Sequence, residues 1–145
     1  MLIWLHDEAL RADHPVFAAA PEARAVFIWD DALFREMHYG FKKLVFIYEA
    51  LTHLPVDIIA GETVPVLRDL AAGGVIVTPQ TSNPHLAAVM ENLSRDHECR
   101  RIADEPFVQL SATPDLKRFF RYWNKARKSA MQPHGGMADL FGGSR

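Results

Sequence analysis

Short apolar runs alternate with amphipathic segments along the first hundred residues of the chain. Each run is closed by charged residues, glycine or a polar loop, and this length and composition are typical of strands buried in a parallel sheet. The runs lie at residues 2–5, 26–29, 56–60 and 75–77, and a fifth, which two arginines interrupt, lies at 99–102. We therefore expect five strands.

The segments between the runs show helical spacing of apolar residues. Residues 41–51 have an apolar face that we expect to pack on the sheet, with Lys42, Lys43 and Glu49 opposite. Residues 63–72 and 85–95 are predicted helices as well. A further short helix is expected from Pro15, with Asp13 as its capping residue. The predicted apolar face of the helix at 41–51 comprises Phe41, Leu44, Val45, Ile47, Tyr48 and Leu51.

This alternation predicts a Rossmann-like, doubly wound α/β fold. About five parallel strands in an order near 3-2-1-4-5, with helices on both faces, are the common solution. Ligands bind such sheets beyond the carboxyl ends of the strands, where the strand order reverses, which here is between the first and fourth strands. The predicted mouth comprises His6, Asp7, Glu8, Asp30, Asp31, Gly61, Glu62 and residues 78–83.

Size and composition favour one soluble domain. A chain of 145 residues suffices for a single core, and no apolar run is long enough to cross a bilayer. The amino terminus lacks a secretion-signal pattern, so we expect a cytoplasmic protein with no membrane association. The single cysteine, Cys99, excludes an internal disulfide.

The positive charge is concentrated near the carboxyl terminus. The net charge is −2, yet residues 116–128 hold six Lys/Arg and no acid. We expect a basic amphipathic helix there, with Phe119, Phe120 and Trp123 on its apolar face. That face could dock on the domain or on a separate protein. Alternatively, the basic and aromatic side chains could bind nucleic acid. The glycine-containing residues 129–145 are expected to form a flexible tail.

Motifs for catalysis are absent from the sequence. Neither the glycine-rich pyrophosphate fingerprint nor a phosphate loop is present, and no nucleophile turn occurs, so no catalytic residue is predicted. Asp30 nevertheless stands where dinucleotide folds place a ribose-binding acid. With His6, Asp7, Glu8 and Asp31 it could also bind a divalent metal. A metal- and nucleotide-dependent enzyme of the wider nucleotide-binding α/β group is therefore the alternative function.

The opening of the chain also carries a family resemblance. A strand ending in Trp4, a charged loop and the sequence Asp13-His14-Pro15 are similar to the start of the DNA photolyase/cryptochrome family. The stretch 119–123, Phe-Phe-Arg-Tyr-Trp, resembles the Phe-x-x-Phe-Trp segment by which that family leaves its amino-terminal α/β domain. The resemblance covers residues 2–128, although His6 and Asp7 stand where the family usually has two arginines.

The resemblance implies a binding site for a light-harvesting chromophore, which would be a flavin, a deazaflavin or a folate. The helical domain that holds the family's catalytic FAD has no counterpart in this sequence, so catalytic FAD is not expected. The resemblance thus implies a stand-alone binding or accessory module, non-catalytic by itself and related to light-dependent DNA repair or photoreception. The helix at 116–128 would dock a separate protein. The implied chromophore site comprises Trp4, Leu5, His6, Asp30, Asp31, Thr78, Gln80 and Asn83.

The tail holds a second short resemblance. Residues 137–141, Met-Ala-Asp-Leu-Phe, resemble the peptide by which bacterial repair and replication proteins bind the sliding clamp, with Met137 in place of the usual glutamine. A flexible segment ending in an apolar pair suits peptide capture in a groove. We therefore expect Leu140 and Phe141 to contact a clamp.

Overall fold

The structure is a computed structural model that describes residues 1–105, 123, 124, 126 and 127. It divides the chain into two compact units, residues 1–104 and residues 105–145. In the second unit residues 123, 124, 126 and 127 are helical, with Trp123 37% exposed and Ala126 buried. Phe119, Phe120, Leu140 and Phe141 lie outside the described residues, as does the predicted tail.

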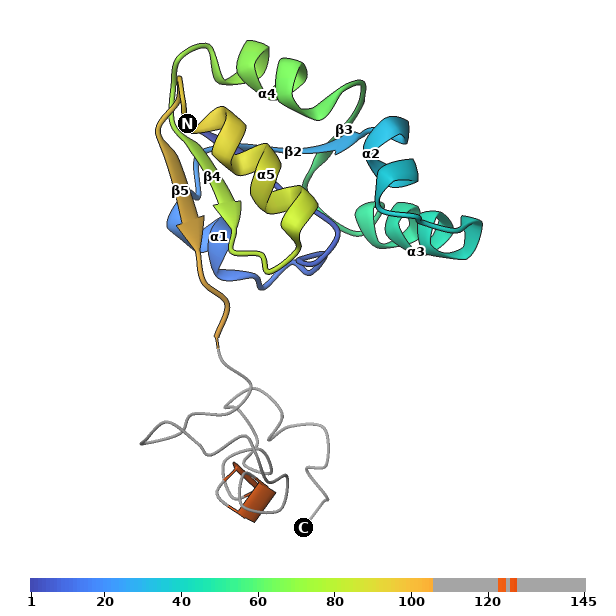
Figure 1. The fold of residues 1–145 in the computed structure, drawn as a ribbon. Coiled ribbons are helices and arrows are strands. Elements are labelled where there is room, and N and C mark those ends of the chain that lie inside the picture. The colour runs from blue at the N-terminus through green and yellow to red at the C-terminus, as the bar shows by residue number, and fades with distance from the viewer. Residues whose placement is uncertain (106–122, 125, 128–145) are drawn as a thin grey trace. The chain divides into compact units, whose positions relative to one another are not determined.

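The first unit is built on a sheet of five parallel strands (Figure 1). The strand order is β3-β2-β1-β4-β5, so the predicted doubly wound α/β fold is confirmed. The central strand β1 pairs with β2 on one side and with β4 on the other. The strands are β1 (Leu2–Trp4), β2 (Arg24–Trp29), β3 (Asp57–Ala60), β4 (Ile76–Pro79) and β5 (Cys99–Ile102).

Helices cover both faces of this sheet. On one face α4 and α5 pack against the core that contains Leu2 and Trp4, and on the other α1 packs against Ile3 and Leu5. In Figure 1, α5 lies beside β4, and α3 lies at the end of the sheet away from β5. The helices are α1 (Pro15–Ala19), α2 (Asp31–Glu36), α3 (Phe41–Leu51), α4 (Thr63–Ala71) and α5 (Pro84–Leu93). Among the described helices, none has the length and apolar character that a membrane span requires.

The first strand is buried on both faces, as its sequence predicts. Successive side chains of a strand point to opposite faces, so each residue of β1 enters one of the two cores. Leu2, Ile3, Trp4 and the following Leu5 are each 3% exposed or less. Fully burying an apolar side chain of this size contributes about 1.5–3 kcal/mol, so each of these four residues stabilises the core by roughly that amount.

The cap of α1 differs from the prediction. His14, not Asp13, precedes the first helical residue, and its Nδ1 accepts the Val16 N–H at 3.1 Å. Because Pro15 occupies the first helical position, the capping position is the residue directly before it. Asp13 is exposed and instead forms an ion pair with Arg11.

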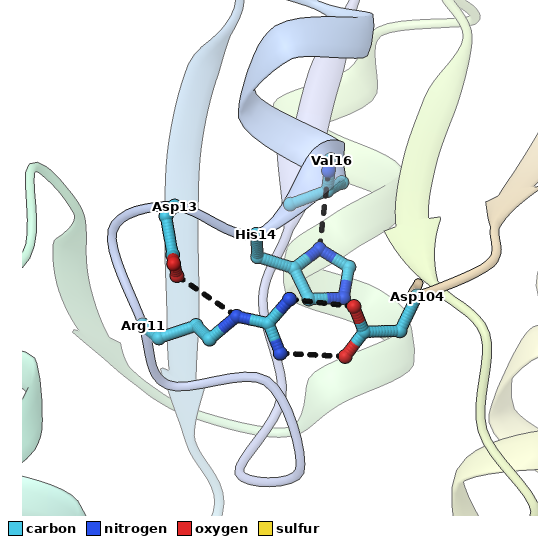
Figure 2. A network of polar contacts seen from close by, with 5 residues as sticks. All are labelled: Arg11, Asp13, His14, Val16 and Asp104. Atoms are coloured by element: carbon cyan, nitrogen blue, oxygen red, sulfur yellow. Dashed lines mark hydrogen bonds and ion pairs between the residues drawn. The ribbon is translucent and has the colours of Figure 1, made fainter. Parts of the chain in front are cut away.

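Arg11 joins the β1–α1 loop to the chain that follows β5 (Figure 2). Its guanidinium donates two hydrogen bonds to the Asp104 carboxylate, at 2.6 and 2.5 Å, and a third to Asp13 at 2.9 Å. Paired N–H donors facing both carboxylate oxygens make a directional contact. Both side chains are nearly half exposed, so the pair contributes no more than about 1 kcal/mol.

The helix α2 has no counterpart in the sequence prediction, which assigned residues 30 and 31 to a polar strand end. Asp30 caps this helix, because its Oδ1 accepts the Ala32 and Leu33 N–H groups at 3.0 Å. Phe34 is buried in the core formed with Phe27, Ile47 and Leu51. The loop after β2 is therefore a packed element of the domain.

The helix α3 packs on the sheet with only part of its apolar face. Ile47 and Leu51 are buried, as predicted, but Phe41, Val45 and Tyr48 are 81%, 38% and 55% exposed. The prediction that the whole face packs is therefore wrong for these three. Since β3 is the last strand of the sheet, no described strand lies beyond it to cover that flank of α3.

Candidate functional site

The polar strand ends gather at one edge of the sheet, and α2 divides that edge into two hollows. The first, which we name the β1/β4 cleft, has a volume of about 450 Å³ and lies at the predicted point where the strand order reverses. It is lined by Glu8, Glu36, Met37, His38, Tyr39, Ser82, Asn83, Pro84 and His85. The second, of about 300 Å³, is lined by Trp29, Asp30, Asp31, Ala32, Arg35, Ala60, Gly61 and Glu62.

One wall of the β1/β4 cleft is the loop between β4 and α5. Thr81 Oγ1 accepts the Asn83 N–H at 2.9 Å and donates to Glu8 at 2.5 Å. Asn83 in turn caps α5 by accepting the His85 N–H at 3.0 Å. His85 Nδ1 lies 3.1 Å from Glu36 Oε1 of α2. These contacts hold the loop in place and join it to the opposite wall.

The other wall is the turn that ends α2. Here the His38 N–H bonds to the Arg35 carbonyl and the Tyr39 N–H to the Phe34 carbonyl, at 3.0 and 2.9 Å, which is the Schellman pattern. His38 takes the left-handed conformation that this pattern needs, with φ 57°. The Tyr39 ring stacks on Phe34, with 5.8 Å between the ring centroids. The Tyr39 side chain is thereby fixed at the side of the cleft.

Tyr39 is also held by a buried carboxylate. Its hydroxyl donates to Asp7 Oδ2 at 2.6 Å, and the ammonium of Lys43 lies 3.0 Å from the same oxygen. Burial and the bond to Asp7 raise the pKa of Tyr39, so the phenol keeps its proton at physiological pH. The positive charge of Lys43 is therefore paired with the carboxylate of Asp7.

The charge of the β1/β4 cleft favours hydrogen-bond donors. Its lining residues include two carboxylates, Glu8 and Glu36, and no lysine or arginine. Carboxylates accept hydrogen bonds and repel anions, so hydroxyl or ring N–H groups fit this lining better than phosphates do. The cleft volume falls within the range of about 300–1,000 Å³ typical of small-molecule sites.

Trp4 and Leu5, which the resemblance placed in the chromophore site, lie beneath the cleft. They are 2% and 0% exposed. The internal cavity that they line with Phe34 and Met37 has a volume of about 10 Å³, and a single water already needs about that much. In this structure α2 therefore separates both side chains from any ligand in the cleft.

His6 and Thr78 are buried at the same edge. The His6 Nε2 lies 3.1 Å from the Pro79 carbonyl, whereas its Nδ1 and the Thr78 Oγ1 have no hydrogen-bond partner among the described residues. Burial lowers the pKa of His6, so the ring is neutral at physiological pH. Nε2 then carries the proton donated to Pro79, and Nδ1 keeps a lone pair. Two buried polar atoms thus lie unsatisfied where the strand order reverses.

Asp30 already has a full set of protein partners. Oδ1 accepts from Ala32 and Leu33, and Oδ2 accepts the N–H and hydroxyl of Thr63 at 2.8 and 2.9 Å. Burial would raise its pKa, but the hydrogen bonds from Leu33, Thr63 and Ala32 outweigh burial and hold that pKa below the ordinary value. A carboxylate has about four acceptor positions, so a ligand would have to displace one of these bonds.

The remaining predicted residues are separated from one another. Asp31 lines the second hollow, on the far side of α2 from the cleft. Gln80 is exposed, donates its N–H to the Ile102 carbonyl at 2.8 Å and lines neither hollow. Of the implied chromophore site, only Asn83 lines the β1/β4 cleft. Chromophore binding by this set as a whole stays a prediction.

A metal site has no support in the described part of the chain. No three histidine, cysteine or acidic side chains there lie close enough together to hold a metal ion. The metal-dependent alternative therefore gains no ligand set from these residues.

The lining residues that the sequence prediction missed include Glu36, Met37, His38, Tyr39 and His85. The first four belong to α2 and the turn that follows it, and the sequence holds a signal for this helix. Asp30 is a capping residue, and Leu33, Phe34 and Met37 recur at helical spacing after it.

Comparison with known proteins adds no assignment, since no family profile, curated protein or solved structure matches the chain.

Proposed function

We propose that this chain is a ligand-binding accessory module akin to the amino-terminal domain of the photolyase/cryptochrome family, and that its ligand occupies the β1/β4 cleft. The observation that carries the proposal is the position of this cleft, at the point of strand-order reversal where doubly wound sheets bind ligands. Light-dependent repair or photoreception is the process in which such a module would serve.

The chemistry of the cleft narrows the ligand to an uncharged aromatic ring with hydroxyl groups. Tyr39 and Met37 offer ring and thioether surface, and Glu8, Glu36 and Asn83 offer oxygen acceptors. Among the expected chromophores, a deazaflavin or riboflavin without phosphate meets these groups. Flavin mononucleotide and folate bring negative charge toward two carboxylates.

Fluorescence titration of the full chain tests this order of preference. Riboflavin, a phosphate-free deazaflavin, flavin mononucleotide and methenyltetrahydrofolate are the four probes, and we expect the two uncharged rings to bind more tightly than the two anions. Glu36→Lys reverses the sign of one wall and should favour flavin mononucleotide over riboflavin. Gln80→Lys adds the same charge to the neighbouring loop outside the cleft, and should leave the order unchanged.

Two results would contradict the proposal. One is a dissociation constant above about 1 mM for all four probes. The other is an equal response to Glu36→Lys and Gln80→Lys, because a ligand in the cleft must sense the first charge more than the second.

The partner interactions inferred from the sequence belong to the same proposal. A separate protein would dock on the helix at 116–128 through Phe119, Phe120 and Trp123, and a sliding clamp would bind Leu140 and Phe141. Pull-down with Trp123→Ala tests the first, and clamp co-purification with Phe141→Ala tests the second. Loss of capture is the expected result in both, whereas a change in thermal stability without loss of capture would contradict the partner interaction.

A further inference from the structure

The exposed flank of α3 forms an apolar stripe beside the open end of the sheet. Phe41, Val45 and Tyr48 follow one another at i, i+4 and i+7, so they lie on one face of the helix. They are 81%, 38% and 55% exposed. Tyr48 contacts Trp29 of β2, with 6.2 Å between ring centroids, which places this flank toward the β2 and β3 end of the sheet.

Ile58 extends the stripe onto the last strand. It is 39% exposed, and its register partner in β2 is Phe27, which lies in the core under α3. Register partners in a parallel pair point to the same face, so Ile58 lies on the α3 side of β3. No described strand pairs with the outer edge of β3.

The size of this stripe suits the apolar centre of a protein interface. From its exposed fractions, the four side chains present roughly 400 Å² of apolar surface. A stable interface takes about 800 Å² from each partner, with an apolar centre and a polar rim. The stripe therefore supplies about half of the area that a second copy would need.

The rim charges indicate which partner and which orientation fit. Lys42 and Glu49 are seven residues apart, so they lie on one side of the stripe, and neither forms an ion pair with a described residue. In an antiparallel pair of α3 helices related by a two-fold axis, Lys42 is level with Glu49 of the partner subunit, and the reverse pair follows by symmetry. In a parallel pair the two-fold axis runs along the helices and places these charges of the two copies on opposite sides of the interface, so neither ion pair could form.

We propose that α3 is a homodimer interface, in which the stripe of Phe41, Val45, Tyr48 and Ile58 packs on the same stripe of a second copy with the α3 helices antiparallel. Two symmetric ion pairs between Lys42 and Glu49 of the partner subunit form part of the polar rim of this interface. The interface is independent of the β1/β4 cleft and of its ligand.

Sedimentation velocity of the full chain tests the dimer. The protein should show a concentration-dependent monomer and dimer equilibrium. Val45→Glu, which places two carboxylates at the two-fold axis, should weaken it by on the order of tenfold or more. Phe46→Glu is the matched control, because Phe46 is 59% exposed but lies roughly 130° around α3 from the stripe. It should leave the dimer unchanged.

Charge exchange tests the orientation. Lys42→Glu alone and Glu49→Lys alone should each weaken the dimer, since each places like charges together. The double variant, and an equimolar mixture of the two single variants, should restore association, as heterodimers in the mixture.

Each of three outcomes overturns the proposal. The first is a monomer at every concentration, and a lower unfolding temperature for Phe41→Glu would then mean that the rest of the chain covers the stripe. The second is a dimer that responds equally to Val45→Glu and Phe46→Glu. The third is a mixture of the charge variants that associates no better than either alone, which excludes the antiparallel pairing.

Discussion

At the scale of single residues, capping side chains decide where two helices of this domain begin. Asp13 and His14 both precede Pro15, and the sequence alone favours the carboxylate as the cap. The structure uses the histidine, because the helix begins at the proline and only the adjacent side chain is in reach. An aspartate ranks high as a cap in general, so residue preference misleads here where position is decisive.

The cap at His14 makes folding stability depend on pH. Burial, with a smaller effect from Arg11, lowers the pKa of His14 below its ordinary 6.5. At pH above 6.5 both folded and unfolded chains hold a neutral ring. Below it the unfolded chain binds a proton that the folded chain does not, so stability falls as the pH drops through the folded pKa. We predict that His14→Asn, which keeps an acceptor but cannot titrate, lowers the slope of stability against pH in urea unfolding.

His6, the second buried histidine, also contributes to the pH dependence of stability. Burial lowers the pKa of His6 too, so some slope below pH 6.5 remains in the His14→Asn variant. A variant with an unchanged slope would show that protonation of His14 does not oppose folding.

The four bonds of Asp30 lead to a second prediction at this scale. Asp30→Ala removes the cap of α2 and both bonds to Thr63, and should lower the free energy of unfolding by about 2 kcal/mol at neutral pH. Since hydrogen bonds keep its pKa low, this stabilisation is present above pH 3.8 and is lost as the pH falls through the folded pKa. Asp31→Ala, at the exposed neighbouring residue, should lower the free energy of unfolding by less than about 1 kcal/mol. Guanidinium unfolding of both variants measures the difference.

At the scale of elements, α2 has the largest effect on the site. It closes the space above Trp4 and Leu5 and separates Asp31 from Asn83. Its carboxyl end is hard to read from sequence, because the nearest glycine, Gly40, stands two residues beyond the position where a helix-ending glycine is usual. His38 occupies the left-handed position where a glycine is usual.

The turn at His38 offers a stabilising substitution. A residue with a Cβ carries a cost of about 1–2 kcal/mol in the left-handed region, and glycine does not. We predict that His38→Gly raises the free energy of unfolding by about 1 kcal/mol. His38→Ala keeps the Cβ and should give no comparable gain, so the difference between the two variants in thermal unfolding isolates the backbone effect.

At the scale of the whole molecule, the fold and the position of the cleft were predictable, and the lining of the cleft was not. Four apolar runs, with a weaker fifth, and the helices between them specify a parallel sheet with helices on both faces, because few arrangements bury both sides of such strands. The location of the cleft also follows from strand order. Its lining depends on where α2 packs, and that depends on buried contacts of Phe34 that no local pattern specifies.

The first unit contains all the described core clusters of the sheet, which use residues 2–102. Residues 1–105 keep these clusters and the pair between Arg11 and Asp104. We therefore predict that a chain ending at residue 105 unfolds in one cooperative guanidinium transition, with a midpoint close to that of the sheet in the full chain. A broad, non-cooperative transition would contradict this.

The central position of β1 has a consequence for synthesis on the ribosome. This strand emerges first, yet it pairs with β4 at residues 76 and 77, so its second neighbour is made more than seventy residues later. Until then a nascent chain carries an apolar segment with one edge open, exposed to chaperones and to other nascent chains. Translation speed over the segment before β4 should thus influence the yield of native protein more than speed at any later codon.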